Sequence, residues 1–244
     1  MTSTLKIDTI EPEGATTTLT VGESGQNTVI AGDGIKANVL KDAGGNALFT
    51  SNGSGTLSGV NSGFGSAQAL ISTQTASTST SVSFTSGIDS TYKKYVFMFF
   101  NINMSDNGSK FRFQCNVDGG SGYDETMTTT MFRAYNTSND TGSSLAYEAT
   151  RDQGQGTSPQ QIIGNVSNTA DSSGSGELHL YNPASTTYIK NFYSRSQVTN
   201  STNPVQATDC FVGGYVNVTG AITQIQFSTD AGTFDGTIKM YGIK

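Results

Sequence analysis

The stretch Asp230-Ala-Gly-Thr-Phe-Asp-Gly-Thr-Ile-Lys-Met-Tyr-Gly-Ile-Lys244 predicts a turn followed by the last strand of a β-domain. Ile238 and Met240 alternate with more polar neighbours, which is the two-residue period of a strand with one buried face. Gly242 allows a β-bulge that would turn Ile243 back toward the core. A strand that runs to the last residue indicates a chain that ends inside its own sheet. We therefore expect a closed β-domain.

The composition agrees with an all-β chain of many short strands. Lys and Arg number 13 and Asp and Glu 19, so the net charge is −6, and charged residues make up only 13% of the sequence, against about 25% in ordinary globular domains. The 29 glycines and the many Ser, Thr and Asn residues favour turns. Because no Lys/Arg cluster is present, we expect neither nucleic acid nor an anionic membrane surface as a partner.

The sequence contains no candidate membrane span or secretory signal. Its longest apolar run, Tyr95–Phe100, has the length of one buried strand, far below the ~20 residues that cross a bilayer. Apolar residues at both odd and even positions predict that this strand is covered on both faces. Residues 1–6 lack the basic start and apolar core of a signal peptide. We therefore expect synthesis and assembly in a cytoplasm.

Residues 1–66 differ from the rest of the chain. They hold only two aromatic residues, Phe49 and Phe64, and their apolar residues come in short runs separated by glycine-rich turns. These runs are Leu5–Ile10, Thr18–Val21, Thr28–Ala31, Val39–Asp42, Ala47–Thr50 and Thr56–Val60. Strands this short cannot bury enough apolar surface in one chain, whereas several copies around a common axis can.

A flexible Gly/Ser linker is the alternative for residues 1–66. The regular spacing of Leu, Ile and Val disfavours it, because a solvated linker needs no apolar residues. We therefore expect an ordered oligomeric attachment region. The stretch Asn61–Ser66 is the expected boundary before a C-terminal domain of residues 67–244.

Residues 67–244 are predicted to form a jelly-roll-like β-sandwich of about ten strands, with no helix. The expected strands lie around Val82–Phe84 and at Tyr95–Met104, Lys110–Val117, Met127–Tyr135, Leu145–Thr150, Gln161–Val166, Glu177–Tyr181, Thr187–Ser196, Thr208–Val218, Ile222–Ser228 and the closing segment. The turn Asp106–Ser109 predicts a hairpin. Phe111 and Cys115 share one face of the strand that follows, so Cys115 is expected in the core.

No constellation of residues predicts catalysis, a metal ion or another cofactor. The single histidine, His179, shares a strand face with Glu177 and Tyr181, and no nucleophile elbow accompanies it. In a strand, the adjacent Asp124 and Glu125 would point to opposite faces and could not flank one glycosidic bond. The Asp-Gly turns lack the ordered ligand series of a calcium loop. We therefore expect a protein that is not an enzyme.

The two cysteines, Cys115 and Cys210, are far apart in sequence and show no metal-ligand spacing. Both occupy strand-like positions, so we expect buried, reduced thiols.

Exposed tyrosine and asparagine side chains in loops can bind sugars by stacking and hydrogen bonding. The candidates for contact with a glycan or receptor are Tyr123, Tyr135, Asn136 and Tyr147. The alternative is that these tyrosines fill the sandwich, a usual role for tyrosine.

Several segments resemble the tail-fibre and related virion proteins of tailed bacteriophages, particularly marine ones. The segments are Ser3–Ile10, the Gly/Thr-rich short-strand region, Leu180–Lys190, Ala221–Phe227 and the closing Gly232–Lys244. They cover both ends and the second half of the chain, and the closing segment is the most characteristic.

The resemblance implies a virion protein that forms a homotrimer. Residues 1–66 would dock on other virion proteins, and the jelly roll would face outward to contact the host surface, where a cell-surface glycan is a candidate receptor. A short tail fibre is the first expectation. A capsid decoration or head-fibre protein is the alternative within the virion, and a polysaccharide-degrading tailspike is the alternative of another class.

Overall fold

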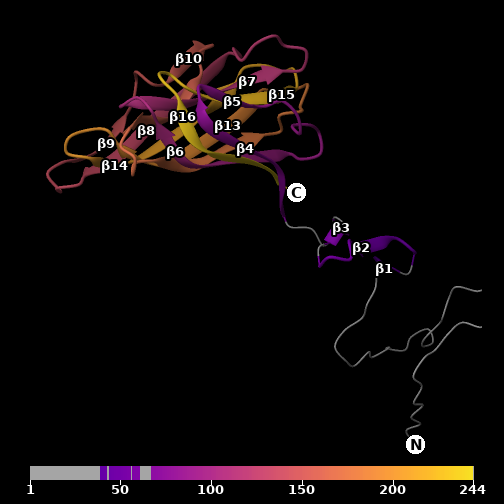
Figure 1. Cartoon of the computed structure of the whole chain (residues 1–244). Coiled ribbons are helices and arrows are strands. Elements are labelled where there is room, and N and C mark those ends of the chain that lie inside the picture. Colours follow the sequence, from indigo (N-terminus) through magenta and orange to yellow (C-terminus); the bar gives the residue numbers. More distant parts are fainter. Residues whose placement is uncertain (1–38, 43, 56, 61–66, 244) are drawn as a thin grey trace, which may run out of the picture. The chain divides into compact units, whose positions relative to one another are not determined.

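The computed structural model describes residues 39–42, 44–55, 57–60 and 67–243 (Figure 1). The chain divides into two units, Met1–Phe64 and Gly65–Lys244. The predicted runs Leu5–Ile10, Thr18–Val21 and Thr28–Ala31 and the predicted boundary Asn61–Ser66 lie outside the described residues.

The described part of the first unit is a three-stranded antiparallel sheet. Its strands are β1 (Val39–Lys41), β2 (Ala47–Ser51) and β3 (Leu57–Val60), in that order. All three coincide with predicted runs. In the β1–β2 turn the Asp42 carboxylate accepts a hydrogen bond of 2.8 Å from the backbone N–H of Asn46. Four apolar side chains of this small sheet are 38–52% exposed: Val39, Leu40, Leu57 and Val60.

The second unit is all-β, as predicted. Its strands are β4 (Gln68–Ser79), β5 (Ser81–Phe84), β6 (Lys94–Met104), β7 (Ser109–Val117), β8 (Met127–Thr137), β9 (Ser143–Tyr147), β10 (Gln153–Gly156), β11 (Gln160–Val166), β12 (Gly174–Tyr181), β13 (Lys190–Asn200), β14 (Gln206–Val216), β15 (Ile222–Thr229) and β16 (Phe234–Ile243). The described residues contain no helix, and so none that is long and apolar enough to cross a membrane.

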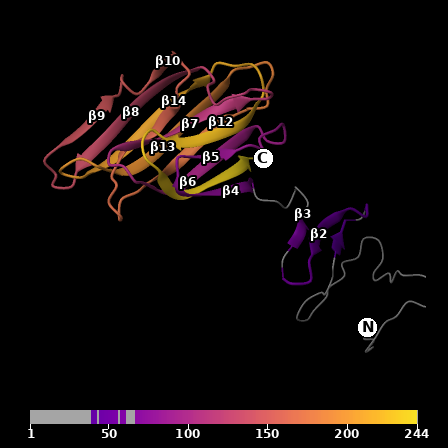
Figure 2. The ribbon, with the colours of Figure 1, turned by 45° about the horizontal axis from the view of Figure 1, so that its top comes forward.

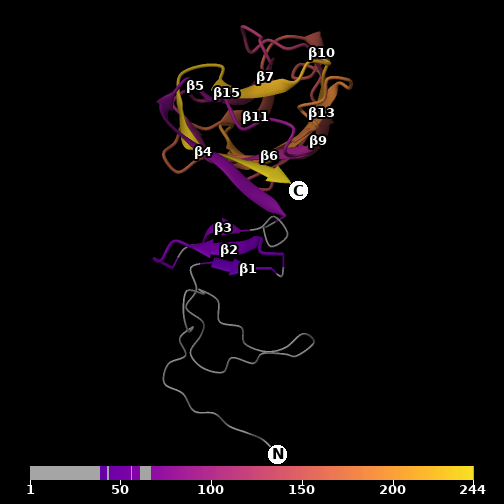
Figure 3. The same ribbon diagram turned by 90° about the vertical axis from the view of Figure 1, so that its right-hand side faces the viewer.

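Eight of these strands form a jelly roll. One layer has the order β4-β16-β6-β12 and the other β5-β15-β7-β11 (Figure 3). If these eight strands are numbered 1 to 8 in chain order, the two layers have the strand orders 1-8-3-6 and 2-7-4-5. The first strand pairs with the last, and the two Greek keys of a jelly roll interlock. The two layers are joined at one edge by a single pair, Val166 of β11 with Asn200 of β13. The predicted fold class is confirmed.

Five further strands lengthen the first layer into a long sheet. From β12 the order continues through β13, β14 and β8, and β9 and β10 share the far edge of β8. Figure 2 shows β9, β8 and β14 side by side beyond the jelly roll. The registers of β13 with β14 and of β14 with β8 are unbroken. The outer face of this long sheet is therefore continuous across many strands.

The space between the layers is filled by aromatic rings. Phe111 and Phe227 stack with their ring centroids 5.6 Å apart, and Phe84, Phe97, Phe99 and Phe234 surround this pair. Cys115 and Cys210 are buried free thiols, as predicted. Burial raises the pKa of the Cys115 thiol well above its ordinary value.

The closing strand β16 lies between β4 and β6 and pairs with both. Ile238 and Met240 are fully buried, as the alternation predicted. The predicted bulge at Gly242 is wrong, because Gly242 is regularly paired with Ala69 and Tyr95. The register shifts instead fall between other residue pairs of β16 and its neighbours, and Ile243 remains half-buried.

Gly242 is a glycine for a different reason. A Cβ at this position would lie closer than 3.0 Å to three ring carbons of Tyr92. The ring of Tyr92 in turn makes an edge contact with Tyr95 of β6, with centroids 5.8 Å apart. The absence of a side chain at position 242 therefore makes room for an aromatic ring over the end of the sheet.

A buried lysine ties the end of β13 to the loop that precedes β15. The side chain of Lys190 is fully buried, and its Nζ donates to three backbone carbonyls at 3.1, 2.9 and 2.6 Å, those of Val218, Thr219 and Gly220. Burial lowers the pKa of Lys190, and the negative charge of Glu125 partly opposes this shift. The ammonium group thus donates hydrogen bonds to three backbone carbonyls that lie outside the strands.

Three other sequence expectations are wrong in detail. The turn Asp106–Ser109 does not make a hairpin, because β6 and β7 belong to different layers. The long strand β4 and the short β10 were not predicted, since neither has an apolar alternation. The run Tyr95–Phe100 is covered on both faces only near its start: on the outer face Val96 is 3% exposed, whereas Phe100 is 40% exposed.

Candidate functional site

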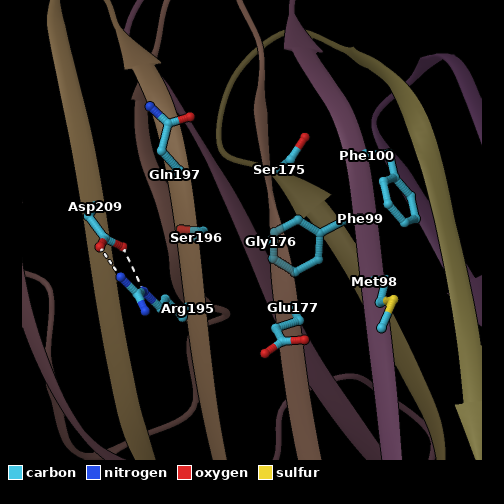
Figure 4. Close-up of a pocket in the computed structure, with 10 residues that line it drawn as sticks. All are labelled: Met98, Phe99, Phe100, Ser175, Gly176, Glu177, Arg195, Ser196, Gln197 and Asp209. Carbon is cyan, nitrogen blue, oxygen red and sulfur yellow. Dashed lines mark hydrogen bonds and ion pairs between the residues drawn. The ribbon is translucent and has the colours of Figure 1, made fainter.

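A groove of about 510 Å³ crosses the outer face of the long sheet at β6, β12, β13 and β14. Figure 4 shows the side chains that line it. They are Met98, Phe99, Phe100, Ser175, Gly176, Glu177, Arg195, Ser196, Gln197 and Asp209.

Strand alternation places these side chains on the outer face. In β13, buried and exposed residues alternate strictly from Lys190 to Val198, so Arg195 and Gln197 point outward. The registers place Glu177 of β12 and Phe211 of β14 on either side of Arg195. Residues paired across neighbouring strands point to the same face of the sheet, so charged and aromatic side chains contact one another across the strands.

Arg195 is fixed in the groove by two different neighbours. Its Nη2 and Nε lie 2.8 and 3.3 Å from the two carboxylate oxygens of Asp209, a bidentate pair. Its guanidinium carbon lies 4.7 Å from the centroid of the Phe211 ring. The hydrogen bonds and charge of Asp209 raise the pKa of Arg195. The guanidinium therefore presents a fixed cation in the middle of the groove.

An aromatic row continues from Arg195 toward the edge of the sheet. The rings of Phe211 and Phe132 stack with centroids 4.8 Å apart and an interplanar angle of 5°. Tyr147 of β9 is the cross-strand partner of Phe132. Phe132 is 41% exposed and Tyr147 55% exposed. Exposed ring faces in a row offer a stacking surface beside the charged groove.

A second aromatic group borders the groove on β12 and β13. The ring of His179 stacks on Tyr193 with centroids 4.3 Å apart, and Tyr181 lies 6.2 Å from the same Tyr193 ring. His179 Nε2 lies 2.9 Å from the carboxylate of Glu177. Burial raises the pKa of Tyr193, and the neighbouring Tyr181 and Glu177 add to this shift. His179 therefore packs between an aromatic ring and a carboxylate.

A smaller hollow of about 300 Å³ adjoins the groove over β13, β14 and β8. Gln197 and Asp209 line both, so the two hollows meet at these side chains. Asn136 and Ala134 of β8 lie on the same face of the sheet as Asp209 and line the smaller hollow. Together the two hollows reach across five strands, from β6 to β8.

The structure places the four predicted contact residues in three different places. Asn136 lies on the outer face at the smaller hollow, and Tyr147 lies on the same face in the aromatic row. Tyr147 donates a hydrogen bond to the carboxylate of Asp152. The backbone of Tyr135 borders the hollow, but its ring lies on the other face of β8, where the guanidinium of Arg133 is 5.5 Å away. Tyr123 lies in the β7–β8 loop and donates to Gln224.

His179 occupies the strand face that the sequence predicted, together with Glu177 and Tyr181. The expectation for Asp124 and Glu125 needs one correction, because both precede β8 instead of lying in a strand. Glu125 accepts a hydrogen bond of 3.0 Å from the backbone N–H of Val117. Within the described ranges, no three His, Cys, Asp or Glu side chains gather in a way that could hold a metal ion.

The residues at the centre of the groove were not among the predicted contact residues: Glu177, Arg195, Gln197 and Asp209. A signal was present. Outward positions of β8, β13 and β14 hold Phe132, Arg195 and Phe211. Aromatic and arginine residues at the solvent-facing positions of a strand are typical of a binding surface.

Comparison of the chain with protein-family models, with curated proteins and with solved structures found no match.

Proposed function

We propose that this chain is a structural virion protein of a tailed phage, a short tail fibre whose jelly roll contacts a host-surface glycan through the groove on the long sheet. The phage assignment rests on the sequence resemblance, above all on the closing segment Gly232–Lys244. The glycan contact rests on one structural observation, the fixed pair Arg195–Asp209 between exposed aromatic and polar side chains.

The groove has the chemistry that sugars require. Saccharides present apolar C–H faces and rims of hydroxyl groups, and the groove offers both kinds of partner. Met98 and Phe100 form an apolar wall, and Glu177, Gln197 and Asp209 supply carboxylate and amide groups that bond to hydroxyls. Because the two hollows span five strands, the site is roughly 19 Å long at ~4.8 Å per strand. That length favours an extended oligosaccharide over a single sugar.

The charges at the centre favour a glycan over a protein partner. The cores of protein–protein interfaces are depleted in charged residues. Here Glu177, Arg195 and Asp209 lie in the middle of the groove, and a dry protein surface would bury them without hydroxyl partners. A hydrated sugar leaves these groups hydrogen-bonded.

We place the trimer contacts and the attachment to other virion proteins in residues 1–66. The sheet β1–β3 supports this assignment, because four of its apolar side chains are 38–52% exposed in the single chain. Copies packed around a common axis would bury Val39, Leu40, Leu57 and Val60 together. A native mass measurement of the full chain is expected to give a trimer, and a stable monomer would contradict this part of the proposal.

A polysaccharide-degrading tailspike is the second candidate function, and one observation favours it. Glu177 and Asp209 line the same groove, so two carboxylates from different strands face one space. The carboxylate of Asp209 is bound on both oxygens by Arg195, which favours an ionised, structural role over that of an acid. We therefore propose that the groove binds without cleaving.

The test is binding of the full chain to an array of bacterial capsular polysaccharides and lipopolysaccharides. We expect binding to a subset of them. Arg195→Met should weaken it about tenfold or more, as expected for loss of a central arginine. Asp171→Asn, an exposed position outside the groove, serves as the control. Equal binding by wild type and Arg195→Met would overturn the assignment of the groove, and release of reducing ends would establish the tailspike alternative.

The position on the particle needs a separate measurement. Antibodies against the jelly roll are expected to label the tail in electron micrographs of the phage. Labelling spread over the head would instead establish a capsid decoration or head-fibre protein and would leave the groove assignment standing.

A further inference from the structure

A second hollow, of about 540 Å³, lies over β7, β11 and the segment that leads from β9 to β11. Its lining is mostly polar and includes three cationic side chains. These cations are Lys110, Arg112 and Arg151, and the two carboxylates that line the hollow are Asp152 and Asp230.

Arg112 is the cation that lacks a carboxylate partner. Lys110 forms an ion pair of 2.7 Å with Asp230, and Arg151 forms one of 3.2 Å with Glu148. Among the described residues, no carboxylate lies within ion-pair distance of Arg112, although its charge helps to lower the pKa of Asp230. One positive charge at the hollow is therefore uncompensated by direct contact.

Two buried N–H donors at the hollow also lack acceptors. The Nη2 of Arg112 donates to the carbonyl of Thr229 at 2.6 Å, but its Nε is buried without a partner. The side chain of Gln161 is only 6% exposed, and its Nε2 is likewise without a partner. Arg112 and Gln161 are cross-strand partners in β7 and β11, so both side chains lie on one face.

Arg151 brings a third donor to the same place. A Cβ on Gly164 would lie within 3.0 Å of both Gln161 Nε2 and Arg151 Nη1, so these two nitrogens are close neighbours. Turning the Gln161 amide would bring its oxygen to the side of Arg151, but the Nε of Arg112 would still lack an acceptor. In either orientation the Arg112 guanidinium keeps a buried N–H without an acceptor, and the one buried acceptor without a donor among the described residues that line the hollow is Gln153 Oε1.

We propose that this hollow binds a single oxyanion, phosphate or sulfate, with Arg112 as the principal ligand and Gln161 and Arg151 completing the contact. Guanidinium groups hold such anions by charge-assisted hydrogen bonds. The anion is either a free ion or a substituent of a surface polymer, which present the same chemistry to the site. The hollow involves β7 and β11 and shares no lining residue with the groove on the long sheet.

The test is a calorimetric titration of the full chain with sodium phosphate, sodium sulfate and sodium chloride at equal ionic strength and constant pH. We expect saturable binding of phosphate or sulfate and none of chloride. Arg112→Met should weaken it about tenfold or more, since a charge-assisted hydrogen bond is lost. Gln161→Met tests the same site if Arg112→Met does not fold. Lys93→Met, with the same loss of charge at an exposed position outside both hollows, should bind as wild type does.

Equal heats of binding for all three salts would overturn the proposal. So would an affinity equal to that of wild type in the Arg112 or Gln161 variant that folds. A titration with glycerol phosphate separates the two sources. Tighter binding of this monoester than of inorganic phosphate assigns the site to a substituent, and the reverse assigns it to a free ion.

Discussion

The ring of Tyr92 fills the place where a side chain on Gly242 would have to lie. A Cβ at position 242 would come closer than 3.0 Å to three carbons of that ring. Gly242 belongs to the last strand and Tyr92 to the segment before β6, so this contact holds two distant parts of the chain together.

Gly242→Ala is expected to destabilise the protein by roughly 1–3 kcal/mol, the usual cost of overpacking. The measurement is the midpoint of urea unfolding. Gly213→Ala is the matched control in a strand, because the nearest atom to its added methyl is Thr130 Oγ1 at 3.9 Å. If both variants unfold at the wild-type midpoint, the packing role of Gly242 is wrong.

Deletion of residues 236–244 should abolish cooperative unfolding. β16 pairs with both β4 and β6 and contributes Ile238 and Met240 to the core. Near-ultraviolet circular dichroism during heating measures the loss. Ile238→Ala is the milder variant, expected to cost about 2–5 kcal/mol while the fold is kept. A truncated protein that is soluble and melts in one sharp transition would contradict this role.

Lys190→Met is expected to cost about 3 kcal/mol, because three buried carbonyls lose their donor. Urea unfolding of the variant measures the cost. Lys93→Met, at an exposed position, should lie within about 0.5 kcal/mol of wild type. A Lys190 variant as stable as the control would mean that water replaces the ammonium group without loss.

Asp230→Asn should lower stability by about 1 kcal/mol at neutral pH. Burial raises the pKa of Asp230, but hydrogen bonds from the side chain and backbone of Lys110 outweigh it and hold the pKa below the ordinary 3.8. The unfolded chain therefore binds more protons between the folded-state pKa and 3.8. The stabilisation is complete above 3.8 and is lost as the pH falls through the folded-state pKa.

Unfolding in urea between pH 2 and pH 6, without phosphate or sulfate, measures this dependence. The difference between wild type and Asp230→Asn should close at the acid end. A difference that stays constant with pH would mean that the charge of Asp230 contributes nothing.

Neither thiol should react with Ellman's reagent in the native protein. Cys115 and Cys210 are at most 1% exposed, and burial raises the pKa of both. In denaturant both should react fully. Ser121→Cys, at an exposed turn, should add one rapidly reacting thiol in the native state. Rapid native reaction of the wild-type protein would show that the core opens.

The fold could be predicted from the sequence where one strand face is buried. Alternation around Ile238 and Phe111 identified the closing strand and one strand of the opposite layer. The strand β4 could not be found in this way, because its Ser- and Thr-rich sequence has no buried stripe and is held by pairing with β16. Turn chemistry located the Asp106–Ser109 turn but could not tell that it passes from one layer to the other.

The candidate site was predictable only in its chemistry. Tyrosine and asparagine were the right residue types, and Asn136 and Tyr147 do lie on the outer face of the long sheet. The centre of the groove depends on which strands become neighbours. Glu177, Arg195 and Asp209 meet only because β12, β13 and β14 pair in one register, and no local pattern contains that register.

The pairing of the first jelly-roll strand with the last has a consequence for biosynthesis. Gln68 pairs with Ile243, so nearly the whole domain separates two residues that lie side by side. A nascent chain would therefore emerge from the ribosome with β4 and β6 unpaired along the edges that β16 later fills, and the sheet would close only once β16 has emerged. Exposed strand edges in that interval invite pairing between chains. Expression at low temperature, or with a chaperone that shields such edges, should therefore raise the yield of soluble protein more than any change of buffer.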